Sequence, residues 1–161
     1  MTTAVELPSG KPGWPIEALI PHSSTMVLLQ RLEDYGDDFL EASLEITPDS
    51  LFLNAEQQVP SWVGIEYMAQ TIAAYAGVKA KQQGADIKVG LLIGTRRFEA
   101  FQPAFESGMR LKIRVAELHQ EGSGLGVFEC TISCSDTPLA KANLNVYQPK
   151  NIDEFMAGVG E

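Results

Sequence analysis

An acidic side chain within an otherwise apolar run is the first feature of chemical interest. Glu66 lies in residues 61–74, SWVGIEYMAQTIAA. Burying an ionised carboxylate without a partner costs free energy, so an acid at this position needs a reason. A buried carboxyl group tends to keep its proton, which suits a general acid. A structural alternative stays open, in which Glu66 is hydrogen-bonded to Gln70, one helical turn away, or to a loop.

His22 is the second candidate for chemistry. Pro21 fixes the backbone just before it, between the end of a short helix and the start of a strand. An imidazole held beside a rigid element suits a general base near neutral pH, although a loop histidine taken alone is more often a bystander. The other histidine, His119, lies beside a turn, and we expect it to face solvent.

A long helix must carry Glu66. The apolar pattern predicts this helix over residues 61–83, with Gly84 ending it. Its first turns have almost no polar side, so we expect the rest of the fold to wrap around it. Helical spacing places Glu66 on one face with Trp62, Ala69, Gln70, Ala73 and Gly77.

Strand patterns lie on both sides of this helix. Two strands forming a hairpin precede it, and three or more strands follow it. This order predicts the α+β class: a single hot-dog domain, in which an antiparallel sheet wraps around one long central helix. Exposed edge strands in such a sheet favour pairing of two subunits edge to edge. The predicted strands are residues 26–33, 39–46, 87–98, 109–115, 128–134 and 139–147.

The predicted hot-dog domain spans residues 15–148. Residues 1–14, rich in proline and glycine, are expected to form a flexible arm, and residues 149–161 a C-terminal tail. The length of 161 residues suits one domain.

Composition excludes several classes of protein. The net charge of −9 argues against a general nucleic-acid binder, and no apolar run approaches the length of a membrane span. Residues 1–13 lack the pattern of a secretory signal, and Cys130 and Cys134 are placed too poorly for a normal disulfide. We therefore expect a cytoplasmic location. Two histidines give no strong zinc-site spacing.

Three segments resemble the 3-hydroxyacyl-[acyl-carrier-protein] dehydratases. Residues 21–29, PHSSTMVLL, are similar to the strand head that carries the family's catalytic histidine. Residues 60–70, PSWVGIEYMAQ, are similar to the helix that carries its acid, and residues 94–108 to its central strand. The likeness extends over residues 16–147 and looks closest to the ApeP-like branch of aryl-polyene clusters. Residues 53–59 depart from the family's pattern, as does Ser61, where glycine is common.

The resemblance implies that His22 is the base and Glu66 the acid, supplied by opposite subunits of a homodimer or of a heterodimer with another hot-dog subunit. It implies no metal or nucleotide cofactor, because the substrate is a thioester on the phosphopantetheine of an acyl carrier protein or of coenzyme A. The implied oxyanion or substrate-binding residues are Ser61, Trp62, Gln70 and Gly94, and the implied contacts to the carrier or its phosphopantetheine are Arg96 and Arg97.

Two other functions stay open at this point. A hot-dog acyl thioesterase would share the fold and ligand but would use the acid to activate water against the thioester. A non-catalytic subunit that binds acyl thioesters or supports assembly would keep the fold without the reaction.

Overall fold

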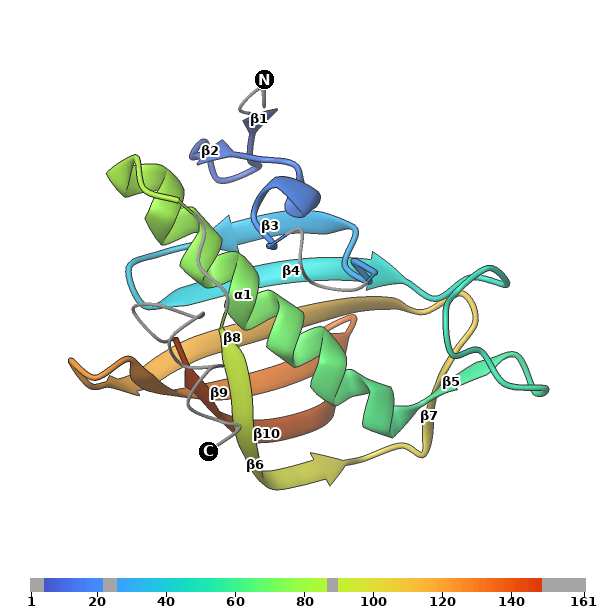
Figure 1. The fold of residues 1–161 in the computed structure, drawn as a ribbon. Coiled ribbons are helices and arrows are strands. Elements are labelled where there is room, and N and C mark those ends of the chain that lie inside the picture. The colour runs from blue at the N-terminus through green and yellow to red at the C-terminus, as the bar shows by residue number, and fades with distance from the viewer. Residues whose placement is uncertain (1–4, 22–25, 87–89, 149–161) are drawn as a thin grey trace.

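The computed structural model describes residues 5–21, 26–86 and 90–148 (Figure 1). One long helix lies against a large antiparallel sheet, as the sequence predicts. The elements in chain order are β1 (Val5–Glu6), β2 (Pro12–Gly13), the 3-10 helix η1 (Ile16–Ala18), β3 (Arg31–Tyr35), β4 (Phe39–Glu45), β5 (Gln58–Pro60), the 3-10 helix η2 (Ser61–Val63), α1 (Gly64–Gln83), β6 (Leu91–Ala100), β7 (Ala104–Glu106), β8 (Arg110–Gln120), β9 (Leu125–Cys134) and β10 (Thr137–Tyr147).

The main sheet has the strand order β3-β4-β8-β9-β10-β6, and every neighbouring pair is antiparallel. Its alternating sequences explain its two faces. In β8, Leu111, Ile113 and Val115 are buried, whereas Arg110 and Lys112 are exposed. The basic residues of β8 therefore belong to a solvated face.

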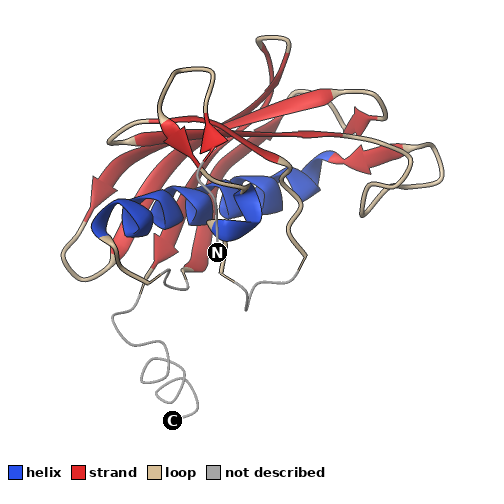
Figure 2. Ribbon diagram, turned by 90° about the horizontal axis from the view of Figure 1, so that it is seen from above, coloured by secondary structure: helices blue, strands red, loops and turns tan. Residues whose placement is uncertain are grey.

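The sheet curves around α1, which Figure 2 shows seen from above. The helix packs against β4, β8, β9 and β10, and Tyr67, Met68 and Val78 are among its buried side chains. It ends where Gly84 adopts a left-handed conformation, φ 64°, which glycine takes without strain. The predicted helix and its stop are confirmed, with residues 61–63 forming η2 ahead of α1.

The first predicted strand begins later than the sequence pattern indicated. Residues 26–30 are not part of a strand, and β3 starts at Arg31. Met26 is 64% exposed and Val27 is 38% exposed, so this end of the apolar run is not in the core. Apolar composition alone cannot separate a strand from an extended segment beside a helix. The strand predicted over residues 87–98 is β6 from Leu91, and residues 87–89 lie outside the described part.

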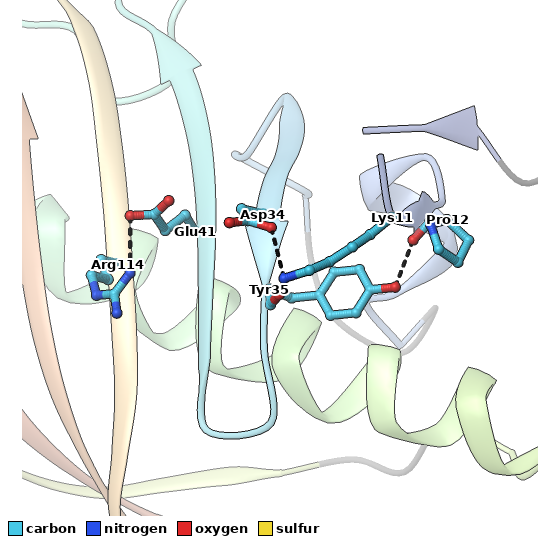
Figure 3. Close-up of polar contacts among 6 residues, drawn as sticks. All are labelled: Lys11, Pro12, Asp34, Tyr35, Glu41 and Arg114. Atoms are coloured by element: carbon cyan, nitrogen blue, oxygen red, sulfur yellow. Dashed lines mark hydrogen bonds and ion pairs between the residues drawn. The ribbon is translucent and has the colours of Figure 1, made fainter. Parts of the chain in front are cut away.

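Residues 5–14, which we call the N-terminal strap, are not a free arm. The strap pairs β1 with β2, and Leu7 is buried in the core. Its Lys11 donates hydrogen bonds to the Asp34 carboxylate and the Tyr35 carbonyl on β3, and Tyr35 returns one from its hydroxyl to the Pro12 carbonyl, 2.7 Å away (Figure 3). These contacts correct the expectation of a flexible arm for residues 5–14. The predicted tail, residues 149–161, lies outside the described residues.

No helix in the described part of the chain is long and apolar enough to cross a membrane.

Candidate active site

The small sheet formed by β5 and β7 packs at the start of the helix that carries Glu66. Val59 on β5 and Phe105 on β7 are fully buried, and the Ser61 N–H donates to the Pro103 carbonyl, 3.0 Å away. At the next turn, a Cβ on Gly64 would lie 2.8 Å from the Ile132 side chain. The helix start therefore sits close against the main sheet.

Glu66 is exposed, which corrects the expectation of a buried carboxyl group. The sheet covers the helix sides that carry Tyr67 and Met68, and Glu66 lies on a side that the described residues leave open. Trp62, one turn earlier on that side, is 61% exposed, and its ring meets the exposed Phe52 edge-on with centroids 6.2 Å apart. A carboxyl group and two aromatic rings thus lie open beside the helix start.

Gln70, one turn after Glu66, is buried and fully engaged. Its Oε1 accepts a hydrogen bond from the Leu28 N–H at 2.8 Å, and its Nε2 donates to the Met26 carbonyl at 2.9 Å. The same Nε2 lies 3.3 Å from Oε1 of Glu66. Gln70 therefore links the acid to the backbone of residues 26–28. The sequence predicted Gln70 as an oxyanion or substrate-binding residue, and its contacts here are to the protein.

His22 lies outside the described residues, but the chain on either side of its segment is attached to α1. Before it, Leu19 is buried and its carbonyl approaches the helix so closely that a Cβ on Gly77 would lie 2.1 Å from it. After it, Met26 and Leu28 bind Gln70. Gln70 and Gly77 are seven residues apart, which places them on one helix face.

The two predicted oxyanion donors at the helix start differ. The Ser61 N–H is already bonded to the Pro103 carbonyl, so it is not available to a thioester. Trp62 follows in the first turn, where backbone N–H groups have no acceptor within the helix. This leaves the Trp62 N–H as the better candidate of the two.

Gly94, Arg96 and Arg97 all lie on β6, an edge strand of the main sheet. Both arginines are exposed, and Arg97 has a positive φ of 55°. Within the described residues, no hydrogen bond or ion pair joins Gly94 or the arginines to Glu66. The hydrogen bonds and ion pairs of the described chain therefore do not link these predicted residues to the acid.

A pocket of about 470 Å³ opens between α1 and the sheet, and its helix wall begins one turn from Glu66. Ala69, Ala73 and Ala76 line it from α1, facing Phe128 of β9 and Val146 of β10. Its volume falls in the range of ~300–1,000 Å³ common to small-molecule sites. Helical spacing placed Ala69 and Ala73 on the face of Glu66, but nothing in the sequence pointed to Phe128, because alternation marks that residue only as core-facing.

The Cys130 thiol is unsuited to act as a nucleophile. Burial, with a smaller contribution from Glu129, raises the pKa of the Cys130 thiol to about 12, so it remains protonated. His119 is exposed beside Glu121, as the sequence predicts. In the described ranges, no group of three or more histidine, cysteine, aspartate or glutamate residues is arranged to hold a metal ion.

Comparison with known proteins identifies a family and a similar structure of appreciable sequence identity. The ApeP-like family, described as ApeP dehydratase, matches residues 14–157. The dehydratase heterocomplex ApeI:P from Xenorhabdus doucetiae contains a chain that is 33% identical, with a TM-score of 0.84. The match covers 91% of this chain and 98% of that one. No curated protein gives a significant match.

More distant structures share the hot-dog fold alone. A hypothetical thioesterase with coenzyme A from Streptococcus pneumoniae is 13% identical, with a TM-score of 0.59 over 73% of this chain and 86% of that one. The Escherichia coli PaaI protein from the phenylacetic acid degradation operon is 16% identical, with a TM-score of 0.57 over 72% and 80%. Their low identity carries no statement about activity.

Proposed function

This chain belongs to the ApeP-like dehydratase family, and from that premise we propose that it removes water from a 3-hydroxyacyl thioester to give a trans-2-enoyl thioester. One observation carries the choice of acid. Glu66 lies in the first turn of α1 with its side chain exposed, and the same helix lines a pocket large enough for an acyl chain.

The proposed reaction uses two protein groups. His22 removes the proton from the carbon α to the thioester, and Glu66 protonates the departing 3-hydroxyl, which leaves as water. Negative charge that develops on the carbonyl oxygen is met by the Trp62 N–H at the positive end of the helix dipole. The His22 proton then returns to solvent and Glu66 is reprotonated, so the protons balance. The proposal requires no resident metal or nucleotide.

The substrate is proposed to be carried on phosphopantetheine. Its acyl chain would enter the pocket beside Ala69 and Ala73, where small side chains leave room. Arg96 and Arg97 are exposed and would bind the phosphate or the acidic carrier protein. Coenzyme A, which is present in the distant Streptococcus pneumoniae structure of the same fold, carries the same phosphopantetheine group. We place the reaction in the cytoplasm, in fatty-acid or polyene biosynthesis.

A second hot-dog subunit is proposed to complete the site. The acid is open to solvent in the described part of the single chain, and one edge of β6 pairs with no other described strand and has exposed residues beside it. The similar chain from Xenorhabdus doucetiae belongs to a heterocomplex of two dehydratase subunits, which supports a heterodimer over a homodimer.

The test is ultraviolet detection of the enoyl product from 3-hydroxyacyl thioesters on carrier protein and on coenzyme A, with the chain alone and in complex with a second dehydratase subunit. We expect His22→Ala and Glu66→Gln each to lower kcat by about 100-fold or more. The matched controls are His119→Ala and Glu56→Gln, which alter exposed side chains elsewhere.

Each rival function has its own outcome in this assay. Release of thiol from saturated acyl thioesters, without enoyl product, would identify a thioesterase. Full activity of the complex when His22 and Glu66 of this chain are replaced would identify a non-catalytic subunit.

A further inference from the structure

The side-chain amide of Gln70 has its orientation dictated by the backbone. The Leu28 N–H can only donate, so it must face the amide oxygen, and the Met26 carbonyl can only accept, so it must face the amide nitrogen. With the amide flipped, Nε2 would face the Leu28 N–H, a donor against a donor, and Oε1 would face the Met26 carbonyl, an acceptor against an acceptor. Since Gln70 is buried, this arrangement is costly to break.

Because the orientation of the amide is fixed, the second N–H of Gln70 Nε2 points toward Glu66. Nε2 has two hydrogens, and one is bonded to the Met26 carbonyl. The other faces Oε1 of Glu66 at 3.3 Å. In the protonated acid, an oxygen that already receives an N–H is the carbonyl oxygen, so the acidic proton sits on Oε2.

We propose that Gln70 is a positioning residue that holds Oε1 of Glu66 and thereby leaves Oε2 to deliver the proton to the leaving hydroxyl. This inference rests on the proposed function, and it replaces the predicted role of Gln70 in binding the substrate oxyanion. Gln70 also joins Glu66 to the chain that follows His22, because its backbone partners are Met26 and Leu28. A single side chain then sets the acid relative to the backbone of residues 26–28.

The experiment measures kcat, KM and the pH profile of enoyl formation for Gln70→Met and Gln70→Glu in the complex. Gln70→Met removes every polar contact at similar length, and Gln70→Glu keeps an acceptor for the Leu28 N–H while losing the donor toward Glu66. We expect kcat to fall about 10- to 100-fold for both with KM within about twofold, and the acidic group's limb of the pH profile to shift. The control is Gln82→Met, an exposed residue of the same helix.

A double-mutant cycle separates positioning from a general loss of structure. If Gln70 acts through the acid, Gln70→Met lowers kcat in the wild type but not in the Glu66→Gln background. Additive losses would overturn the inference. Hydrogen exchange at the Leu28 amide gives a second measurement: faster exchange in Gln70→Met with unchanged kcat would leave Gln70 a structural residue only. Absence of enoyl product from the wild-type complex would overturn the proposed function itself, together with this inference.

Discussion

The two edge strands of the main sheet, β3 and β6, differ in how far other described residues cover them. At the β3 edge, the N-terminal strap covers the strand, with Lys11 bound to Asp34 and to the Tyr35 carbonyl. At the β6 edge, the described residues provide no such cover, and Leu92 and Ile93 are 42% and 58% exposed. An unpaired strand edge with apolar side chains favours pairing with another chain. From this difference we expect a second subunit to bind at β6.

The largest expected effect on this difference between the edges comes from removing the side chain of Tyr35, which anchors the strap. Tyr35 is buried, bonds to the Pro12 carbonyl and packs against Trp14 with ring centroids 6.1 Å apart. We expect Tyr35→Ala to lower the free energy of unfolding by about 3 kcal/mol or more, since it leaves a large cavity. Chemical denaturation measures this loss, and light scattering measures any self-association at the uncovered β3 edge.

Tyr35→Phe is the matched control, because it keeps the ring and removes only the hydroxyl. It should cost about 1 kcal/mol. Equal losses in the two variants would show that the strap depends on the hydrogen bond alone.

A charged residue on β6 tests whether a partner subunit binds at that edge. Ile93→Lys places an ammonium group where we expect the partner strand to lie, so the partner subunit should bind at least about tenfold more weakly. The isolated chain should keep its stability within about 0.5 kcal/mol, because Ile93 is exposed. Val5→Lys, on the strap, is the control. Unchanged affinity for Ile93→Lys would move the interface elsewhere.

The smallest expected effect is a pH dependence at the strap. Burial raises the pKa of Asp34, but hydrogen bonds from the Tyr35 backbone and from Lys11 outweigh it, and the pKa lies below its usual 3.8. The stabilisation is therefore present above about pH 4 and is lost as the pH falls through the lowered pKa. Asp34→Asn should lose less stability than wild type in urea titrations between pH 5 and pH 2.5. Parallel curves would contradict a contribution from this carboxylate.

Periodicity predicted the elements that the core itself determines. Alternation in β4 placed Leu40 and Leu44 on the buried face, and the apolar run with Gly84 gave the helix and its end. These patterns depend on which side chains of each strand or helix face the core. The predicted order of strands and helix was correct for the same reason.

Contacts between distant segments were beyond such patterns. The strap contains few large apolar residues, and of these only Leu7 and Trp14 pack against the core. Residues 26–28 bind Gln70 from outside any strand, and an apolar run in the sequence does not distinguish such a segment from a strand. Glu66 was expected to be buried because its neighbours in sequence are apolar, whereas its exposure depends on which side of α1 the sheet leaves open. The position of His22 relative to Glu66 stays a prediction.

The irregular pairing of β6 has a consequence for how selective the chain is. The register between β10 and β6 shifts twice, and both times the extra residue is on β6, at Ile93 and next to Arg97. Bulged edges are poor templates for an arbitrary extended peptide, because a regular strand soon falls out of step with them. An edge of this kind resists amyloid-like stacking in a crowded cell while accepting a subunit whose own edge carries complementary irregularities. In the proposed complex, recognition of the partner would then depend on backbone geometry as well as on side chains.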